Sequence, residues 1–268
     1  MRRFVISAVL GAVLAASAVV GSAFASGDAV KIEGQDWSFN GMFGKYDKKQ
    51  LQRGFQVYKD VCSGCHSLRL VAYRNLLEIG LTEEAAKEYA AGFSVPAGPN
   101  DDGETIVDGE LLMRPAKLSD KLVPPFANEK AARAGNSGAL PPDLSLMAKA
   151  RKGGPDYIYA LLTKYEEEVP EKFAHDYKEQ HGEEFVLPEG MSFNHVFPGY
   201  QIAMAPPLSA ESVEYEDGTE PTLENHAKDI TAFLNWAAEP ELEVRKAMGV
   251  KVMIFLLLLS AMLFAFKK

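Results

Sequence analysis

The sequence has only two cysteines among its 268 residues, and this scarcity limits the disulfide and metal chemistry open to it. A structural zinc site usually takes four ligands, and no second cysteine pair is present to complete one. The chain also lacks an excess of basic residues, because 28 Lys and Arg stand against 37 Asp and Glu, for a formal net charge of −9. We therefore expect no nucleic-acid partner, whereas a basic protein is a reasonable one.

The long hydrophobic runs lie at the two ends of the chain. At the first end, Arg2 and Arg3 precede an apolar run over about residues 4–20, and Ala23-Phe-Ala25 offers the small residues that a signal peptidase reads. These features predict a cleaved secretory signal peptide at residues 1–25, with a retained N-terminal membrane helix as the alternative. A mitochondrial transit peptide would be amphipathic and richer in Arg and Ser. Cleavage would remove both arginines and take the formal charge from −9 to −11.

The second apolar run covers residues 248–266 and is interrupted only by Lys251 near one end and by a single serine. At about 1.5 Å per residue it is just long enough to cross a hydrocarbon core about 30 Å thick. A buried helix of a soluble domain is the alternative. With an exported body, we expect a single-pass protein of a bacterial inner membrane, with a periplasmic domain at 26–247, an anchor at 248–266 and a short cytoplasmic end at 267–268.

The two cysteines stand in the sequence Cys62-Ser-Gly-Cys65-His66, the C-x-x-C-H pattern of covalent c-type haem attachment. Two thiols three positions apart, on one helical turn, can reach the two vinyl groups of a single porphyrin. The following residue, His66, then supplies an imidazole to the iron. The pattern predicts one covalently bound haem c, held by Cys62 and Cys65 as thioethers.

Three other uses of these cysteines must be weighed. An exported protein could join them in a disulfide. A thioredoxin-like redox pair would need a βαβ pattern around it, and the residues before Cys62 do not resemble a buried strand. Half of a zinc site is disfavoured by the missing second pair.

Two segments have the spacing of amphipathic helices. The first leads into Cys62, and the second is stopped by Pro240; their apolar positions are Leu51, Gly54, Phe55, Tyr58 and Val61, then Ile230, Phe233, Leu234 and Ala237. In small c-type cytochromes the first and last helices of the haem domain pack together, and Gly54 would permit a close approach. Two unrelated helices would give the same pattern.

A methionine opposite His66 would keep the iron six-coordinate, and its soft thioether raises the reduction potential. The candidates outside the apolar ends are Met42, Met113, Met147, Met191 and Met204. Met204 is favoured because Pro206 and Pro207 stiffen the chain after it, and Met191 is the next choice. Four histidines could also ligate, although each fits a surface or structural role: His175, His181, His195 and His226.

Taken together, these residues resemble the cytochrome c1 family, the haem subunit of ubiquinol–cytochrome c oxidoreductase (bc1) complexes, in its alphaproteobacterial type. The resemblance covers nearly the whole chain after the leader. Its landmarks are Arg53-Gly-Phe-Gln-Val-Tyr58, Cys62-Ser-Gly-Cys-His66, Gly138-Ala-Leu-Pro-Pro-Asp-Leu-Ser145, Lys149-Ala-Arg-Lys-Gly-Gly-Pro-Asp-Tyr157, Phe197-Pro-Gly199, Ile202-Ala-Met-Ala-Pro-Pro207, Tyr215-Glu-Asp-Gly-Thr219, Phe233-Leu-Asn-Trp-Ala-Ala-Glu-Pro240 and Arg245-Lys-Ala-Met-Gly249.

The resemblance implies roles that spacing does not give. It makes Met204 the second axial ligand beside His66, and it assigns Arg151, Tyr157 and Asn136 to the haem propionates. A forked guanidinium suits a carboxylate, although Arg151 alone would pass for a solvated surface cation. It also implies that Pro141 and Pro142 line the haem pocket.

The family fold implied is a mostly α, class I cytochrome c-like haem domain with long loops and one C-terminal transmembrane helix. The implied function is an electron-carrier subunit, without substrate chemistry at its own haem. It would work in a membrane complex, expected to be dimeric, with cytochrome b and the Rieske iron–sulfur protein; the Rieske protein would reduce it, and it would reduce a cytochrome c. Some bacterial relatives have an additional cysteine pair that this sequence lacks.

Two segments and the functional class each admit more than one interpretation from the sequence. The acidic segment 164–189 would suit docking of a basic cytochrome c, or is simply a solvated loop; segment 101–128 is loop-rich and matches no motif. The alternatives from other functional classes are a catalytic haem of peroxidase or reductase type, with one axial site open, and a sensing or scaffold role for the haem.

Overall fold

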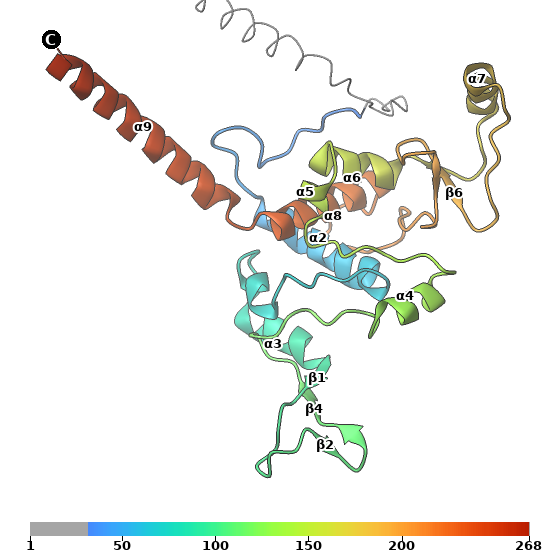
Figure 1. Ribbon diagram of the computed structural model, residues 1–268, viewed down its shortest axis with the longest axis horizontal. Coiled ribbons are helices and arrows are strands. Elements are labelled where there is room, and N and C mark those ends of the chain that lie inside the picture. Colours follow the sequence, from blue (N-terminus) through green and yellow to red (C-terminus); the bar gives the residue numbers. More distant parts are fainter. Residues whose placement is uncertain (1–31, 268) are drawn as a thin grey trace, which may run out of the picture. The chain divides into compact units, whose positions relative to one another are not determined.

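The computed structural model describes residues 32–267, so the predicted signal peptide at 1–25 lies outside the described residues. Within this range the chain is mostly helical, as the sequence predicts (Figure 1). Its α-helices and two 3₁₀ turns (η) are α2 (Lys48–Asp60), η1 (Cys62–Gly64), η2 (Tyr73–Leu77), α3 (Glu83–Ala91), α4 (Glu129–Gly135), α5 (Met147–Ala150), α6 (Gly154–Thr163), α7 (Glu171–His181), α8 (Leu223–Ala238) and α9 (Leu242–Lys267).

The strands are short and form small antiparallel sheets between the helices. One sheet pairs β1 with β4, another pairs β2 with β3, and a third has the order β5-β6-β7. Segment 101–128, which matched no motif, contains the second pair and one strand of the first. The strands are β1 (Ser94–Pro96), β2 (Ile106–Val107), β3 (Glu110–Leu111), β4 (Met113–Pro115), β5 (Tyr165–Glu166), β6 (Ser192–Asn194) and β7 (Gln201–Ile202).

Part of the acidic segment 164–189 is helical rather than loop, which corrects the sequence prediction. Helix α7 follows Pro170 and ends at Gly182, whose φ of 73° is the left-handed conformation that terminates many helices. Lys172 and Asp176 form an ion pair of 2.7 Å one turn apart on this helix, a local interaction that favours helix over loop.

The two predicted amphipathic helices are α2 and α8, and they pack against each other in the core. The Asp47 carboxylate caps the start of α2 by accepting hydrogen bonds from the backbone N–H groups of Lys49 and Gln50. Helix α8 ends two residues before Pro240, as predicted. Rings from both helices meet, because Phe55 and Tyr58 lie 5.7 and 5.9 Å from the Phe233 ring between centroids. Figure 1 shows α2 and α8 side by side, with α5 and α6 next to α8.

Gly54 is the point of closest approach between these helices. A Cβ added there would lie 2.1 Å from the Asp229 carbonyl oxygen and 2.7 Å from the Phe233 Cβ. The predicted close approach at Gly54 is therefore confirmed, and any larger residue would push α2 away from α8.

An ion pair joins the same helices beside that contact. Arg53 donates through Nε to Asp229 at 2.7 Å and through a terminal nitrogen to Asp217 at 3.0 Å. Asp229 is only 2% exposed, and Arg53 compensates for its burial, since an unpaired buried carboxylate is costly.

Helix α9 contains the whole predicted anchor at 248–266 and begins six residues before it. Among the residues that the structure describes, it is the helix long and apolar enough to cross a membrane. Its side chains from Lys251 onward are exposed, which suits a surface that faces lipid rather than a protein core.

We predict that Gly54→Ala destabilises the protein. Alanine in a helix interior gains about 1 kcal/mol over glycine, but overpacking costs about 1–3 kcal/mol, and the clashing Asp229 oxygen belongs to backbone that cannot rotate away. Chemical unfolding of the detergent-solubilised chain should show a lower free energy of unfolding. Gly34→Ala is the matched control, because its Cβ would lie 3.8 Å from its nearest neighbour; equal stability of the two variants would contradict the prediction.

Candidate haem-binding site

The two cysteines and His66 lie on one tight turn at the end of α2. Helix α2 passes directly into η1, and the backbone N–H groups of Cys65 and His66 both donate to the Cys62 carbonyl, at 3.1 and 2.9 Å. Both thiols are unpaired, so Cys62 and Cys65 do not form a disulfide in this structure. The turn holds two sulfurs and an imidazole within a few residues, which is the donor set that a covalent haem requires.

The Cys62 thiol is unsuited to redox exchange. Burial, reinforced by the neighbouring Cys65, raises the pKa of Cys62 to about 12. Catalytic Cys-x-x-Cys pairs work with a lowered thiol pKa, because the thiolate is the nucleophile. The electrostatics therefore argue against the thioredoxin-like alternative and leave haem attachment as the better fit.

The His66 ring is oriented by a backbone carbonyl. Its Nδ1 lies 2.8 Å from the Pro142 carbonyl oxygen, and since a carbonyl can only accept, Nδ1 carries the proton and Nε2 keeps its lone pair. Burial lowers the pKa of His66 below its usual 6.5, which favours the neutral, metal-binding form. Tyr58 donates to the His66 carbonyl at 3.1 Å and fixes the backbone of this residue.

Asp143 fastens the Pro142 segment to the cysteine turn, and sequence reasoning did not single it out. Its carboxylate accepts from the Ser67 hydroxyl at 2.7 Å, from the Arg69 backbone at 2.9 Å and from the Ser145 backbone at 2.9 Å. Burial alone would raise the pKa of Asp143, but these hydrogen bonds outweigh it and hold the pKa below 3.8. Asp143 therefore positions the carbonyl that orients His66.

The residues predicted to contact the propionates occupy separate elements. Arg151 is exposed at the end of α5, and its guanidinium makes a long 3.4 Å contact with the carbonyl of the preceding residue, Ala150. Tyr157 is buried on α6; burial raises its pKa, and the Arg151 charge partly offsets the rise, so the two lie within electrostatic reach. Asn136 caps α4 and donates to the Ala132 carbonyl at 2.7 Å.

Of the two prolines predicted to line the pocket, Pro142 is placed directly against His66 by its carbonyl. Pro141, the preceding residue, is half-buried in the same segment.

Met204 lies in a bend two residues after β7 and is half-buried. The chain after it, Pro206 to Leu208, lines a recess of about 370 Å³ together with Leu162 and Tyr165 from the end of α6 and from β5. The buried Tyr165 hydroxyl has no hydrogen-bond partner among the described residues. Neither Met204 nor His66 lines this recess, so the observation that bears on Met204 is the stiff proline segment that follows it.

The four histidines considered as alternatives have other surroundings. His226 is fully buried, and its two ring nitrogens face the carbonyls of Ser209 and Val213 at 3.0 and 2.8 Å. His195 pairs with Glu166 at 2.6 Å, and His181 stacks on the Tyr177 ring at 4.3 Å on α7.

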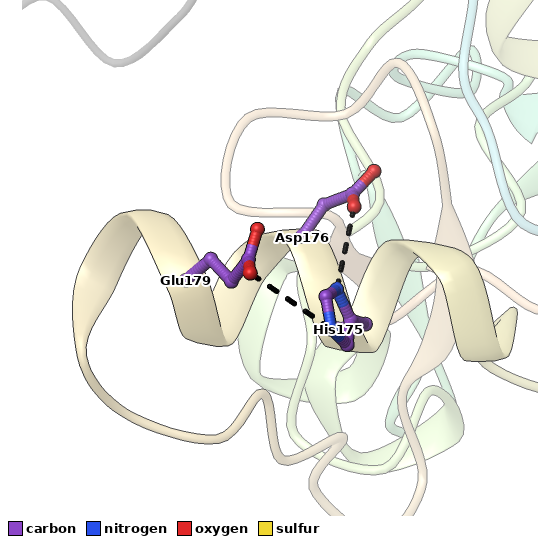
Figure 2. A group of neighbouring side chains, drawn as sticks. All are labelled: His175, Asp176 and Glu179. Atoms are coloured by element: carbon purple, nitrogen blue, oxygen red, sulfur yellow. Dashed lines mark ion pairs between the residues drawn. The ribbon is translucent and has the colours of Figure 1, made fainter.

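The fourth, His175, belongs to an exposed group on α7 with Asp176 and Glu179 (Figure 2). Its two ring nitrogens turn to different carboxylates, at 3.7 Å for Asp176 and 3.9 Å for Glu179. Asp176 is also paired with Lys172. A metal ion needs donor atoms that converge on one point, so this arrangement is a surface network of charges.

The comparisons with known proteins give one family for this chain. Residues 37–268 match the model of the family described as Cytochrome C1 family. The chain is 49% identical to "Cytochrome c1" of Rhodospirillum rubrum over 253 residues, which are 93% of this chain and 91% of that protein.

Two other relatives carry names that refer to a complex. The chain is 41% identical over 247 residues to "Cytochrome b/c1" of Bradyrhizobium diazoefficiens, covering 89% of this chain and 35% of that protein. It is 46% identical over 221 residues to "Cytochrome b-c1 complex catalytic subunit, mitochondrial" of Candida albicans, covering 82% of this chain and 70% of that protein.

We predict that Asp143→Asn lowers the free energy of unfolding at pH 7 by about 1–3 kcal/mol, the usual worth of hydrogen bonds to a charged group. The folded-state pKa is depressed, so this contribution is present above about pH 3.8 and is lost as the pH falls through the lower folded value. The difference between wild type and variant should therefore shrink below pH 3.8. A pH-independent difference would contradict it, and the exposed Asp108→Asn is the control.

Proposed function

Because this chain belongs to the cytochrome c1 family, a family of haem c proteins that transfer electrons, we propose specific residues for each part of that task. Cys62 and Cys65 form the thioethers, and His66 and Met204 are the two axial ligands. The haem supplies a one-electron couple. The observation that carries this assignment is the protonated Nδ1 of His66 on Pro142, which leaves Nε2 free to bind a metal.

Neighbouring residues hold the two proposed ligands, His66 and Met204, in place. His66 is fixed through Pro142 and Asp143, and Met204 is fixed by the proline pair that follows it. A haem held by both His66 and Met204 would have no axial position open to a substrate, and it would supply electron transfer without bond making or breaking. Keeping both ligands in place in the two redox states would keep reorganisation small.

Arg151, Tyr157 and Asn136 are assigned to bind the haem propionates, and Pro141 and Pro142 to line the haem pocket. Arg151 supports this assignment, because its guanidinium is exposed and makes only a long contact within its own helix region. A planar fork of donors suits a carboxylate, and its charge would help to set the reduction potential.

We place the chain in a cytochrome bc1 complex, with cytochrome b and a Rieske iron–sulfur protein as neighbours, in a dimeric assembly. The names of the relatives from Bradyrhizobium diazoefficiens and Candida albicans support membership of such a complex. Residues 1–25 are a cleaved leader, 26–247 the periplasmic domain, 248–266 the inner-membrane anchor and 267–268 the cytoplasmic end. The exposed apolar α9 supports the anchor.

We propose that the acceptor is a cytochrome c and that it docks near two carboxylates of the acidic segment 164–189. Several acids of segment 164–189 already have partners: Glu166 with His195, Asp176 with Lys172 and Glu184 with Lys178. Glu167 and Glu168 are exposed, and Glu167 borders the recess formed by Pro206 and Pro207 beyond Met204. These two carboxylates therefore meet a basic partner close to the proposed axial ligand.

We predict that Met204→Leu keeps the covalent haem but opens one axial position. The reduction potential should fall, because a soft thioether that stabilises the reduced iron is lost, and carbon monoxide should bind to the reduced protein. Redox titration and absorption spectra measure both effects. Met191→Leu is the matched control, and if it, rather than Met204→Leu, exposed the iron, the ligand assignment would be wrong; ready binding of carbon monoxide to wild type would favour a catalytic haem.

We predict that Glu167→Gln with Glu168→Gln slows reduction of a basic cytochrome c at low ionic strength. It should also flatten the dependence of the rate on salt, because steering between opposite charges is screened by ions. Stopped-flow kinetics provide the measurement. Glu179→Gln with Glu183→Gln removes the same charge from α7 and the loop after it. An equal effect of the two pairs would mean that net charge alone, rather than the position of the carboxylates, sets the rate.

A further inference from the structure

Two large apolar side chains are exposed in a short turn before α2, which we call the 40–44 turn. Met42 is 66% exposed and Phe43 is 77% exposed. The aromatic residues on either side behave differently, because Phe39 is 4% exposed and its ring packs on Tyr46 with centroids 5.2 Å apart. The flanking ring of Phe39 is thus packed, whereas the two large apolar side chains at the tip of the turn are not.

The 40–44 turn has a fixed shape. The Lys45 backbone N–H donates to the Ser38 carbonyl at 3.0 Å and closes it. Gly44 is pressed against the backbone of Asn40, where an added Cβ would lie 1.9 Å from the carbonyl oxygen. A turn closed this tightly presents its tip to the outside in a constant direction.

The base of the turn is fastened to the first turns of α9. Lys246 donates through Nζ to the carbonyls of Phe39 and Gly44. The Tyr46 backbone N–H donates to the Glu243 carboxylate at 3.0 Å. In Figure 1 the segment before α2 lies next to the beginning of α9.

This attachment sets the depth of the turn wherever α9 crosses a membrane. The apolar run begins at Met248, two residues after Lys246, a rise of about 3 Å at about 1.5 Å per residue. The headgroup layer on each side of the hydrocarbon core is about 5–7 Å thick. The 40–44 turn is therefore held at the level of the headgroups, next to the point where the anchor enters lipid.

The charges around the turn suit the same environment. Although the chain has a formal charge of −9, exposed cations gather here: Lys45, Lys48, Lys49 and Arg245. Acidic residues lie among them as well. Asp47 caps α2 and Glu243 accepts from the Tyr46 backbone. Glu239 pairs with Arg245, and Glu241 is exposed just before α9, so the exposed positive charge of the turn itself comes from Lys45, Lys48 and Lys49. Basic residues close to a membrane surface are attracted to anionic headgroups.

We propose that the 40–44 turn is a second membrane contact, in which Met42 and Phe43 enter the boundary between headgroups and acyl chains of the leaflet that α9 enters. Aromatic and apolar side chains bound in this layer reach about 5–10 Å into it. With α9 alone, the haem domain would be joined to the membrane at a single point. The second contact limits rotation of the domain about the anchor. It therefore fixes the distance between the proposed haem site and the membrane surface. This inference rests on the proposed role of α9 as the anchor.

Spin labelling of the full chain in lipid nanodiscs that contain anionic phospholipid tests the proposal. Nitroxides are attached to Phe43→Cys, to Val186→Cys as a water-exposed control and to Leu257→Cys as a lipid-exposed control, since Val186 and Leu257 are 74% and 67% exposed. The wild-type chain, treated with the same reagent, reports any labelling of Cys62 and Cys65. Power saturation then compares collisions with oxygen, which enters lipid, against a water-soluble nickel chelate.

The expected ratio of oxygen to nickel collisions at position 43 is several-fold above that at position 186 and below that at position 257. A ratio equal to that at 186 would place the turn in water and overturn the proposal. Shielding from both agents would show that protein covers the turn, which also overturns it. A water-like ratio at 257 would instead overturn the anchor itself, so the two failures are distinguishable.

Discussion

The contact between α2 and α8 at Gly54 sets the position of the Cys62 turn, from which the proposed site is built. Helix α2 ends in the Cys62 turn, so any displacement of α2 moves both thiols and the imidazole of His66. The backbone-to-backbone approach leaves no room for a side chain, and the buried Arg53–Asp229 pair holds the helices in register beside it. A tight helix pair thus gives a covalently attached group a rigid base, which electron transfer with little reorganisation requires.

Hydrogen bonds, rather than packing, orient the His66 imidazole on that base. The Pro142 carbonyl fixes which nitrogen of His66 carries the proton, and Asp143 fixes Pro142 by binding Ser67 and Arg69, which directly follow the cysteine turn. Second-layer contacts of this kind tune metal ligands as much as the ligands themselves do. The raised pKa of Cys62 fits the same picture, because a thiol destined for a thioether has no need to be a stable thiolate.

Local patterns could be predicted from the sequence, whereas long-range contacts could not. The Cys62 turn, α2 and α8 follow from spacing within a few residues, and the apolar run of α9 follows from composition. The role of Asp143 depends on partners 74 to 76 residues away, and nothing in its own neighbourhood marks it. The same is true of Tyr46, whose partner Glu243 lies 197 positions along the chain. Helix α7 was missed because its acidic residues are typical of a solvated loop, and only side-chain pairs within the helix distinguish the two.

The account depends most on a porphyrin that is joined to the polypeptide through sulfur. A denaturing gel of the purified chain, stained for haem-dependent peroxidase activity, measures this directly, because only a covalently attached group survives denaturation. The account predicts a stained band at the mass of the chain, and no stain when Cys62 and Cys65 are both replaced by serine. An unstained wild-type band, from cells that mature other c-type cytochromes, would contradict it.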